Sequence, residues 1–291
     1  MFTGVESTKA ITAKEVERSI RELELRQPTA TLSVFRDSVP VWPIGKRFYV
    51  TDNQITHILR PTNTSDTTSL AGQIITYDGY TTGSVLDNRN TLTLRFRHDG
   101  DTAEYQLRTN KTLSEFPQSY SIPLLIDLDQ VTNVAKQIQG KSFYIKTTLW
   151  RDIETDQPLS GRQFIPVTIT SVKPGNKALP LRVEFITGDT RERGFVYMSA
   201  PGNDMQGRDF DSMFSAADIR RSYSEISDNH WLLITQGRVE TEMTKEECRL
   251  ALGAPKRINQ LPDQSGLREY WYYDGGNYLF FVDGLLKRFR Q

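Results

Sequence analysis

A short pattern that occurs twice constrains the architecture of this 291-residue chain more than any other feature. The stretch IGKRFYV spans 44–50, and QGKSFYI spans 139–145. In both, the glycine permits a turn into a strand, and the Phe and Tyr that follow point to opposite faces of that strand. Further along, Phe96 is matched by Phe185 in the same order. The pattern predicts a tandem repeat of a small β unit; the alternative is chance similarity between two β-rich segments.

The segments around these patterns are typical of short strands joined by tight turns. From Thr29 to about Leu107, and again up to about Met198, runs rich in Thr, Val, Ile and aromatic residues are separated by Gly, Asn and Asp. Units of this length with five or six short strands usually close into small barrels, because closure removes exposed strand edges. The pattern resembles tandem SH3-like barrels, in architecture only.

A helix is expected before each β unit. Thr12 and Glu15 form a capping box for a helix that ends before Pro28. Asp129 is the expected N-cap of a second helix, and Gly140 ends it. The apolar face of this second helix consists of Val131, Val134, Ala135 and Ile138.

The C-terminal segment predicts a helix followed by an antiparallel meander. Thr244 and Glu247 form a capping box, and Gly253 ends the helix. The strands REYWYY, NYLFFV and LLKRF follow, joined by the hairpin turns DGGN and DG. The single cysteine, Cys248, lies within the helix and is expected to be a buried core residue.

Together these elements predict a fold that is mainly β with an α+β part, in four segments. The segments are an N-terminal tail and helix (1–28), a first β-barrel unit (29–125), a second β-barrel unit with its leading helix (126–200), and a final part (201–291). In the final part a linker is expected at 201–211, a helix near 215–226 and a strand in HWLLITQGRV, before the C-terminal module.

The last 55 residues or so carry a set of motif positions: Gly237, Val239, Met243, Thr244, Leu252, Gly253, Pro255, Trp271, Tyr273, Phe281, Asp283 and Gly284. In these positions the segment resembles the BamE/SmpA/OmlA family of small outer-membrane lipoproteins, and more loosely the β-lactamase-inhibitor-protein-like fold. Two positions depart from the family pattern, Cys248 for the usual Val and Glu242 for a frequent Gly. The resemblance implies a protein-binding module of a bacterial envelope.

Aromatic residues are the candidate binding residues. Strand alternation places Tyr270 and Tyr272 on the face opposite Trp271, with Phe280 as a neighbour. Exposed aromatics of this kind are enriched at protein contacts; alternatively, this face packs against the chain's own β units or the expected helix at 215–226. Trp42 and Trp150 lie beside loops, where they stack on sugars or peptides, or else belong to the core.

Composition and motifs argue against several other functions. Lys plus Arg equals Asp plus Glu, 36 each, which weakens the case for a nucleic-acid partner. No apolar run is long enough to span a membrane, and no nucleotide, metal or hydrolase motif is present. We therefore expect no cofactor, no metal and no enzymatic activity.

The sequence predicts a non-enzymatic scaffold of the bacterial cell envelope whose partner is another envelope protein. A carbohydrate- or peptidoglycan-binding module is the first alternative, and a hydrolase with an unrecognised site is the second. The polar start, MFTGVESTKAITAKE, suits a cytoplasmic protein. It suits equally a periplasmic or lipid-anchored one whose export signal has been removed, with Met1 in place of a lipid-modified cysteine.

Overall fold

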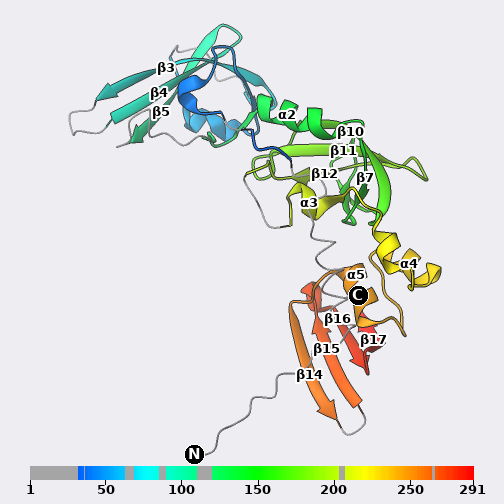
Figure 1. Ribbon diagram of the computed structural model, residues 1–291. Helices are drawn as coiled ribbons and strands as arrows, with labels where there is room; N and C mark the ends of the chain where they lie inside the picture. The colour runs from blue at the N-terminus through cyan, green and yellow to red at the C-terminus, as the bar shows by residue number, and fades with distance from the viewer. Residues whose placement is uncertain are drawn as a thin grey trace, which may run out of the picture.

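The computed structural model describes residues 32–35, 37–62, 69–84, 90–109, 120–202, 207–263 and 266–291. Within these residues the chain is mainly β and forms three antiparallel sheets that follow one another along the sequence (Figure 1). Each sheet has its own cluster of buried apolar residues. The helix expected between Thr12 and Pro28 lies outside the described residues.

The first sheet has six strands in the order β2-β5-β4-β3-β1-β6. Its core holds Trp42, Phe48, Tyr77 and Phe96, whose rings contact one another edge to face or at a tilt. The elements are the 3-10 helices η1 (Val39–Val41) and η2 (Asn53–His57) and the strands β1 (Arg47–Val50), β2 (Leu59–Pro61), β3 (Ile74–Ser84), β4 (Asn90–His98), β5 (Asp101–Thr109) and β6 (Leu125–Asp127).

The second sheet has seven strands in the order β13-β7-β10-β11-β12-β8-β9. Its strands are β7 (Ser142–Ile145), β8 (Leu149–Arg151), β9 (Pro158–Ser160), β10 (Ile165–Pro174), β11 (Leu181–Thr187), β12 (Arg193–Met198) and β13 (Phe214–Ser215). A short helix, α3 (Phe210–Met213), leads into β13 and adds Phe210 and Met213 to the core. This sheet therefore reaches Ser215, beyond the boundary at 200 and the linker that the sequence suggested, because β13 pairs with β7.

The repeated sequence pattern occupies equivalent positions in these two sheets. The strands β6-β1-β3-β4-β5-β2 of the first sheet correspond in order to β13-β7-β10-β11-β12-β8 of the second. Gly45 has a φ of +89° and donates its N–H to the Tyr77 carbonyl at 2.8 Å. Gly140 has a φ of +79° and donates to the Ile169 carbonyl at the same distance. Positive φ at both sites explains why the pattern requires glycine there.

The match extends to the register of the later strands. Tyr77 lies opposite Phe96, Ile169 lies opposite Phe185, and a register shift follows directly after each of the two pairs. The Phe of each repeated stretch is buried and the Tyr is half-buried. In the described residues, no ladder joins the two edge strands of either sheet.

Helix α2 (Leu128–Ile138) connects the two sheets and contacts both β1 and β10. Val131, Val134 and Ile138 are buried, as expected for its apolar face. The N-cap is Asp127 rather than Asp129: the Asp127 carboxylate accepts the backbone N–H of Asp129 at 2.9 Å. The helix begins directly after β6, so the cap falls two residues earlier than the sequence suggested.

The segment before the C-terminal module differs from expectation. The apolar run HWLLIT forms helix α4 (Asp228–Thr235) and not a strand. Ser227 caps it by accepting the His230 N–H, and periodicity alone does not separate a short buried helix from a strand. The helix expected near 215–226 is limited to the 3-10 turn η4 (Ile219–Tyr223).

The C-terminal module packs α4 and α5 (Lys245–Leu252) against a four-stranded sheet, as the coarse prediction of helix and meander requires. The capping box of Thr244 and Glu247 is present, and Cys248 is fully buried. An additional strand, β14, precedes the three expected ones. The strands are β14 (Arg257–Asp263), β15 (Gly266–Tyr272), β16 (Tyr278–Val282) and β17 (Leu285–Arg290), with the 3-10 turn η5 (Asp274–Gly276) between β15 and β16.

One buried side chain from the segment between β9 and β10 joins the second sheet to this module. The Gln163 Nε2 atom donates to the carbonyls at the ends of α4 and α5, and lies 3.0 Å from those of Ile234, Leu250 and Ala251. The backbone N–H of Gln163 donates to the Thr235 carbonyl at 2.7 Å. A polar side chain thus satisfies helix-terminal acceptors that would otherwise be buried without a donor.

Candidate functional site

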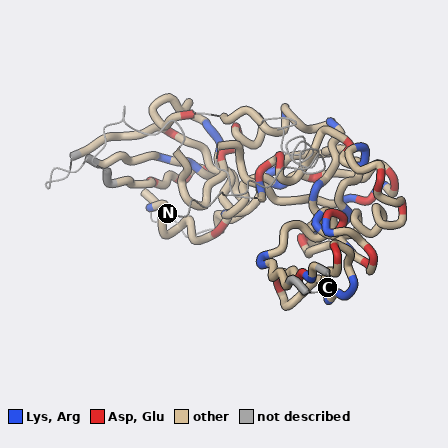
Figure 2. Tube along the Cα trace, turned by 60° about the horizontal axis from the view of Figure 1, so that its bottom comes forward, with Lys and Arg blue, Asp and Glu red and all other residues tan. Residues whose placement is uncertain are grey.

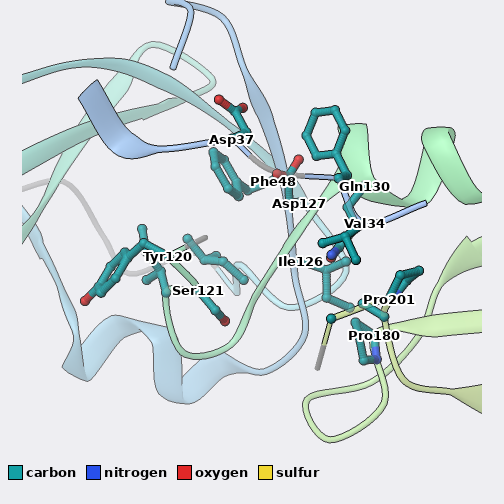
Figure 3. Close-up of a pocket in the computed structure, with 15 residues that line it drawn as sticks. Val34, Asp37, Phe48, Tyr120, Ser121, Ile126, Asp127, Gln130, Pro180 and Pro201 are labelled. Carbon is teal, nitrogen blue, oxygen red and sulfur yellow. The ribbon is translucent and has the colours of Figure 1, made fainter. Parts of the chain in front are cut away.

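A cavity of about 320 Å³ lies where the first and second sheets approach each other (Figure 3). The chain segment that precedes the first sheet, which contains Val34, crosses this cavity. Val34 therefore faces residues of both sheets. Gly202 has a positive φ, and a Cβ there would meet Val34 at 2.9 Å, which shows how closely the segment is packed. The lining includes Asp37, Phe48, Tyr120, Ser121, Ile126, Asp127, Gln130, Pro180 and Pro201.

A buried ammonium group lies beside this cavity and holds three carboxylates. The Lys46 Nζ atom is 2.8 Å from Asp37, 2.9 Å from Asp127 and 2.8 Å from Asp129, and its side chain is inaccessible to solvent. Because Lys46 precedes β1 while Asp127 and Asp129 flank the start of α2, these ion pairs hold the helix against the first sheet.

The protonation of this cluster follows from burial and charge together. Burial lowers the pKa of Lys46, but the three carboxylates outweigh it, and the pKa lies above its ordinary value. Burial raises the pKa of Asp127 despite its contact with Lys46. A carboxyl group of raised pKa at a cavity is a feature of acid–base sites, although structural ion-pair networks also produce it.

The two candidate tryptophans lie inside the cores. Trp42 packs edge-on against Tyr77 at 5.4 Å, and Trp150 packs edge-on against Phe185 at 5.1 Å. Both side chains are more than nine-tenths buried. A Cβ at Gly161 would lie 2.0 Å from the Trp150 ring, so the ring occupies the space beside that backbone. The prediction that these rings stack on sugars or peptides is therefore wrong, because neither ring face is open to a ligand.

The other three candidates form a cluster on one face of the C-terminal sheet. Tyr270 and Tyr272 stack with centroids 6.4 Å apart, and Tyr270 contacts Phe280 at 4.6 Å. All three are half-buried, whereas Trp271 between the two tyrosines is buried on the opposite face. The structure thus brings these residues together on the face that the helices do not cover.

Arginines surround this cluster. Arg257 lies opposite Tyr272, with its guanidinium 4.4 Å from the ring centroid, and Arg288 lies opposite Phe280. Alternation along β15 and β17 places Arg268 and Arg290 on the same face. All four arginines are exposed. We call this surface the arginine–aromatic face; its described residues are Arg257, Asn259, Leu261, Arg268, Tyr270, Tyr272, Tyr278, Phe280, Val282, Arg288 and Arg290.

The charge of this face is a local property. Over the described chain, basic and acidic residues are interspersed (Figure 2), and the whole sequence has no net charge. From Arg257 to Leu261 and along the described side chains of β15, β16 and β17, this face has four arginines and no carboxylate. Sequence reasoning missed Arg257 because β14 was not recognised. It did not consider Arg268, Arg288 and Arg290, which lie in or directly after strands that it did predict.

The remaining chemically active side chains have structural roles. His230 Nδ1 lies 2.6 Å from Glu247 and thereby joins α4 to α5. Burial raises the pKa of Cys248 to about 12, so its thiol stays protonated. Among the residues that the structure describes, no group of three or more His, Cys, Asp or Glu is arranged to hold a metal ion. Nor does any described helix combine the length and the apolar character that crossing a membrane requires.

Comparison with known proteins adds no relative: no family model, no curated protein and no solved structure matches this chain. The likeness of the C-terminal module to the BamE family therefore stays a prediction, and function must be argued from the surface and the sites described above.

Proposed function

We propose that this protein is a non-enzymatic scaffold of the bacterial cell envelope that binds a partner protein through the arginine–aromatic face. The observation that carries this proposal is an aromatic centre, Tyr270, Tyr272 and Phe280, rimmed by four exposed arginines. Protein interfaces have this composition, since aromatic residues and Arg are enriched in their centres and contribute most of the binding energy.

The two β units supply the body of the scaffold. We infer that they arose by duplication of one small unit of the SH3-like barrel type. The equivalent glycine turns, strand orders and register shifts support this inference. The buried side chain of Gln163 connects the second unit to the binding module.

The envelope location rests on the resemblance of the C-terminal module to a family of outer-membrane lipoproteins. Under this proposal the partner is another envelope protein, and the native precursor carries an export signal or a lipid anchor. A cytoplasmic location is the alternative, and fractionation of cells that produce the full-length precursor separates the two.

Capture of partners tests the proposal. The tagged protein and a Tyr270→Ala/Tyr272→Ala variant are each incubated with solubilised envelopes of the source organism, and bound proteins are identified by mass spectrometry. Leu149→Ala is the matched control, since Leu149 is exposed on the second sheet. We expect a discrete partner that the control retains and the double variant loses. Equal capture by all three proteins, with unchanged circular dichroism, would refute this use of the face.

A hydrolase is the second candidate, and the cavity beside Lys46 is the observation that favours it. Asp37 and Asp127 both line the cavity, and burial raises the pKa of Asp127. Asp127→Asn should abolish any hydrolysis of chromogenic glycosides or esters by this site. Equal turnover by the wild-type protein and Asp127→Asn, or turnover by neither, would leave Lys46 and its carboxylates a purely structural cluster.

A further inference from the structure

The two edges of the C-terminal sheet differ in what covers them. At the β17 edge, Glu242 donates its N–H to the Leu286 carbonyl, and Leu286 donates to the Met243 carbonyl, both at 2.8 Å. Lys287, Arg288 and Arg290 add charge along this strand, which is a common way of protecting an edge. The β17 edge is therefore both paired and charged.

The β14 edge is unpaired within the described residues, and between Arg257 and Leu261 its one charged side chain is that of Arg257. Every side chain from Arg257 to Leu261 is exposed, including the apolar Ile258 and Leu261. The sheet order ends at β14, so within the described residues no strand lies beyond it. A seven-residue edge strand with exposed apolar side chains is a template for another strand.

The backbone groups available on this edge follow from the ladder. Leu267 accepts the Asp283 N–H at 3.0 Å, so its backbone faces β16. In an antiparallel ladder neighbouring residues alternate in direction, and the β15 residues that face β14 are therefore Arg268, Tyr270 and Tyr272. The partners of these three residues in β14 are Leu261, Asn259 and Arg257, whose backbone groups therefore face β15. Ile258 and Gln260 lie between these partners and turn their N–H and C=O groups outward, away from β15.

The side chains on this edge indicate what the added strand would carry. On the arginine–aromatic face the edge presents Arg257, Asn259 and Leu261, and Arg268 lies one strand further in. A strand added beside β14 would place alternate side chains against this row. The guanidinium of an arginine pairs well with a carboxylate side chain of the added strand, because it can donate to both carboxylate oxygens. Leu261 favours an apolar side chain on the added strand.

We propose that β14 is the docking strand for an extended, acidic segment of the partner protein, which adds to the C-terminal sheet as a fifth strand. This inference rests on the proposed function, because it specifies how the partner engages the same face. The main-chain bonds of Ile258 and Gln260 supply affinity, and Arg257 on the edge itself selects an acidic side chain. The half-buried rings of Tyr270 and Tyr272 lie further in on the same face, where a longer partner segment reaches them.

The test begins with selection of random twelve-residue peptides on the immobilised full chain. We expect the enriched peptides to alternate acidic with apolar or β-branched residues and to lack a central proline. Selected peptides are then synthesised with a fluorophore and titrated by anisotropy. Enrichment of basic or proline-rich sequences, or of none, would overturn the proposal.

Gln260→Pro is the decisive variant, because it removes an outward N–H while leaving the bonds to β15 in place. The chain itself has proline two positions later, at Pro262 in the same strand. We expect about tenfold weaker peptide binding by Gln260→Pro, while the control Gln260→Ala, which keeps the N–H, stays within about twofold. Equal binding by the two variants would exclude strand addition.

Charge reversal provides an independent arm if Gln260→Pro fails to fold. Arg257→Glu with Leu261→Glu changes only exposed side chains and should weaken acidic peptides by tenfold or more, with the effect reduced at high salt. Three outcomes would overturn the proposal. The first is tighter binding of a fifteen-nucleotide oligo(dT) than of any peptide, and the second is peptide binding that is seen only after deletion of residues 1–31. The third is a dimer of the full chain that the Gln260→Pro substitution dissociates.

The two proposals fail in different ways. If the envelope partner is lost from Tyr270→Ala/Tyr272→Ala but retained by Gln260→Pro, the scaffold function stands and strand addition is wrong. If neither variant loses a partner, the proposed function itself is wrong.

Discussion

Replacement of Lys46 by methionine tests whether the buried ammonium is what holds the first sheet and α2 together. Methionine has a similar length and no charge, so the main change is the loss of three ion pairs. The carboxylates of Asp37, Asp127 and Asp129 then face one another without a cation. Since each lies within 2.9 Å of the same nitrogen, any two of these oxygens are at most about 6 Å apart.

The expected loss of stability follows from this geometry. Two unit charges about 6 Å apart repel by about 3 kcal/mol at an effective dielectric constant of about 20. Breaking a buried ion pair by removing one partner costs about 3–5 kcal/mol. Asp129 is 43% exposed, so solvent screens part of the repulsion that involves it. We therefore expect Lys46→Met to lower the free energy of unfolding by about 3–5 kcal/mol at pH 7.5.

The loss should depend on pH in a stated direction. In the wild-type protein the pKa of Lys46 is raised, so its contribution is complete below pH 10.5 and declines only as pH rises through the folded-state value. In Lys46→Met the like charges raise the pKa values of the carboxyl groups, and the folded variant binds more protons than the unfolded chain. These carboxyl groups therefore destabilise the folded variant increasingly as pH rises from about 4, and the deficit relative to the wild-type protein should shrink by about half at pH 4.5.

Urea unfolding followed by circular dichroism at both pH values measures this deficit. The control is Lys141→Met, since Lys141 is the equivalent lysine of the second repeated stretch and is exposed; it should cost less than about 0.5 kcal/mol. A Lys46→Met deficit below about 1 kcal/mol, or one equal at pH 4.5 and 7.5, would refute the reasoning.

Three further changes test the packing described above. Trp271→Ala should cost about 3–5 kcal/mol in urea unfolding, whereas Tyr272→Ala on the other face should cost less than about 1 kcal/mol; equal losses would mean that both faces are buried. Gln163→Ala leaves helix-terminal carbonyls without their donor, and should cost about 1–3 kcal/mol and let the C-terminal module unfold first. Gly161→Ala introduces a Cβ into the Trp150 ring, and a melting temperature unchanged within error would contradict the 2.0 Å approach.

The sequence predicted those features that depend on local backbone geometry. Gly45 and Gly140 both need a positive φ, and the strand alternation after them places Phe in the core and a half-buried Tyr on the opposite face of each strand. The capping box at Thr244 is likewise local, since both of its hydrogen bonds lie within one helical turn. Such features survive in any tertiary context that allows the element to form.

The features that sequence reasoning missed depend on partners far along the chain. The run HWLLIT becomes a helix because it packs against α5 and because Gln163 satisfies its carbonyl end. The strand β14 contains Pro262 and exposed polar residues, and it is a strand only because β15 offers it a ladder. Trp42 and Trp150 lie beside loops in the sequence, yet both rings are buried in the apolar cores of their sheets.

The two lysines of the repeated pattern show that some contacts are common to both units and others occur in only one. Lys46 is buried against three carboxylates, whereas Lys141 is exposed, although both follow the same glycine turn. Strand pairing explains the difference. Asp127 ends β6, and the equivalent position after β13 is Ala216, which has no charge to offer. The glycine and Phe therefore stabilise the fold of each unit. The lysine stabilises the contact with α2 in the first unit alone, because α2 directly follows that unit's last strand.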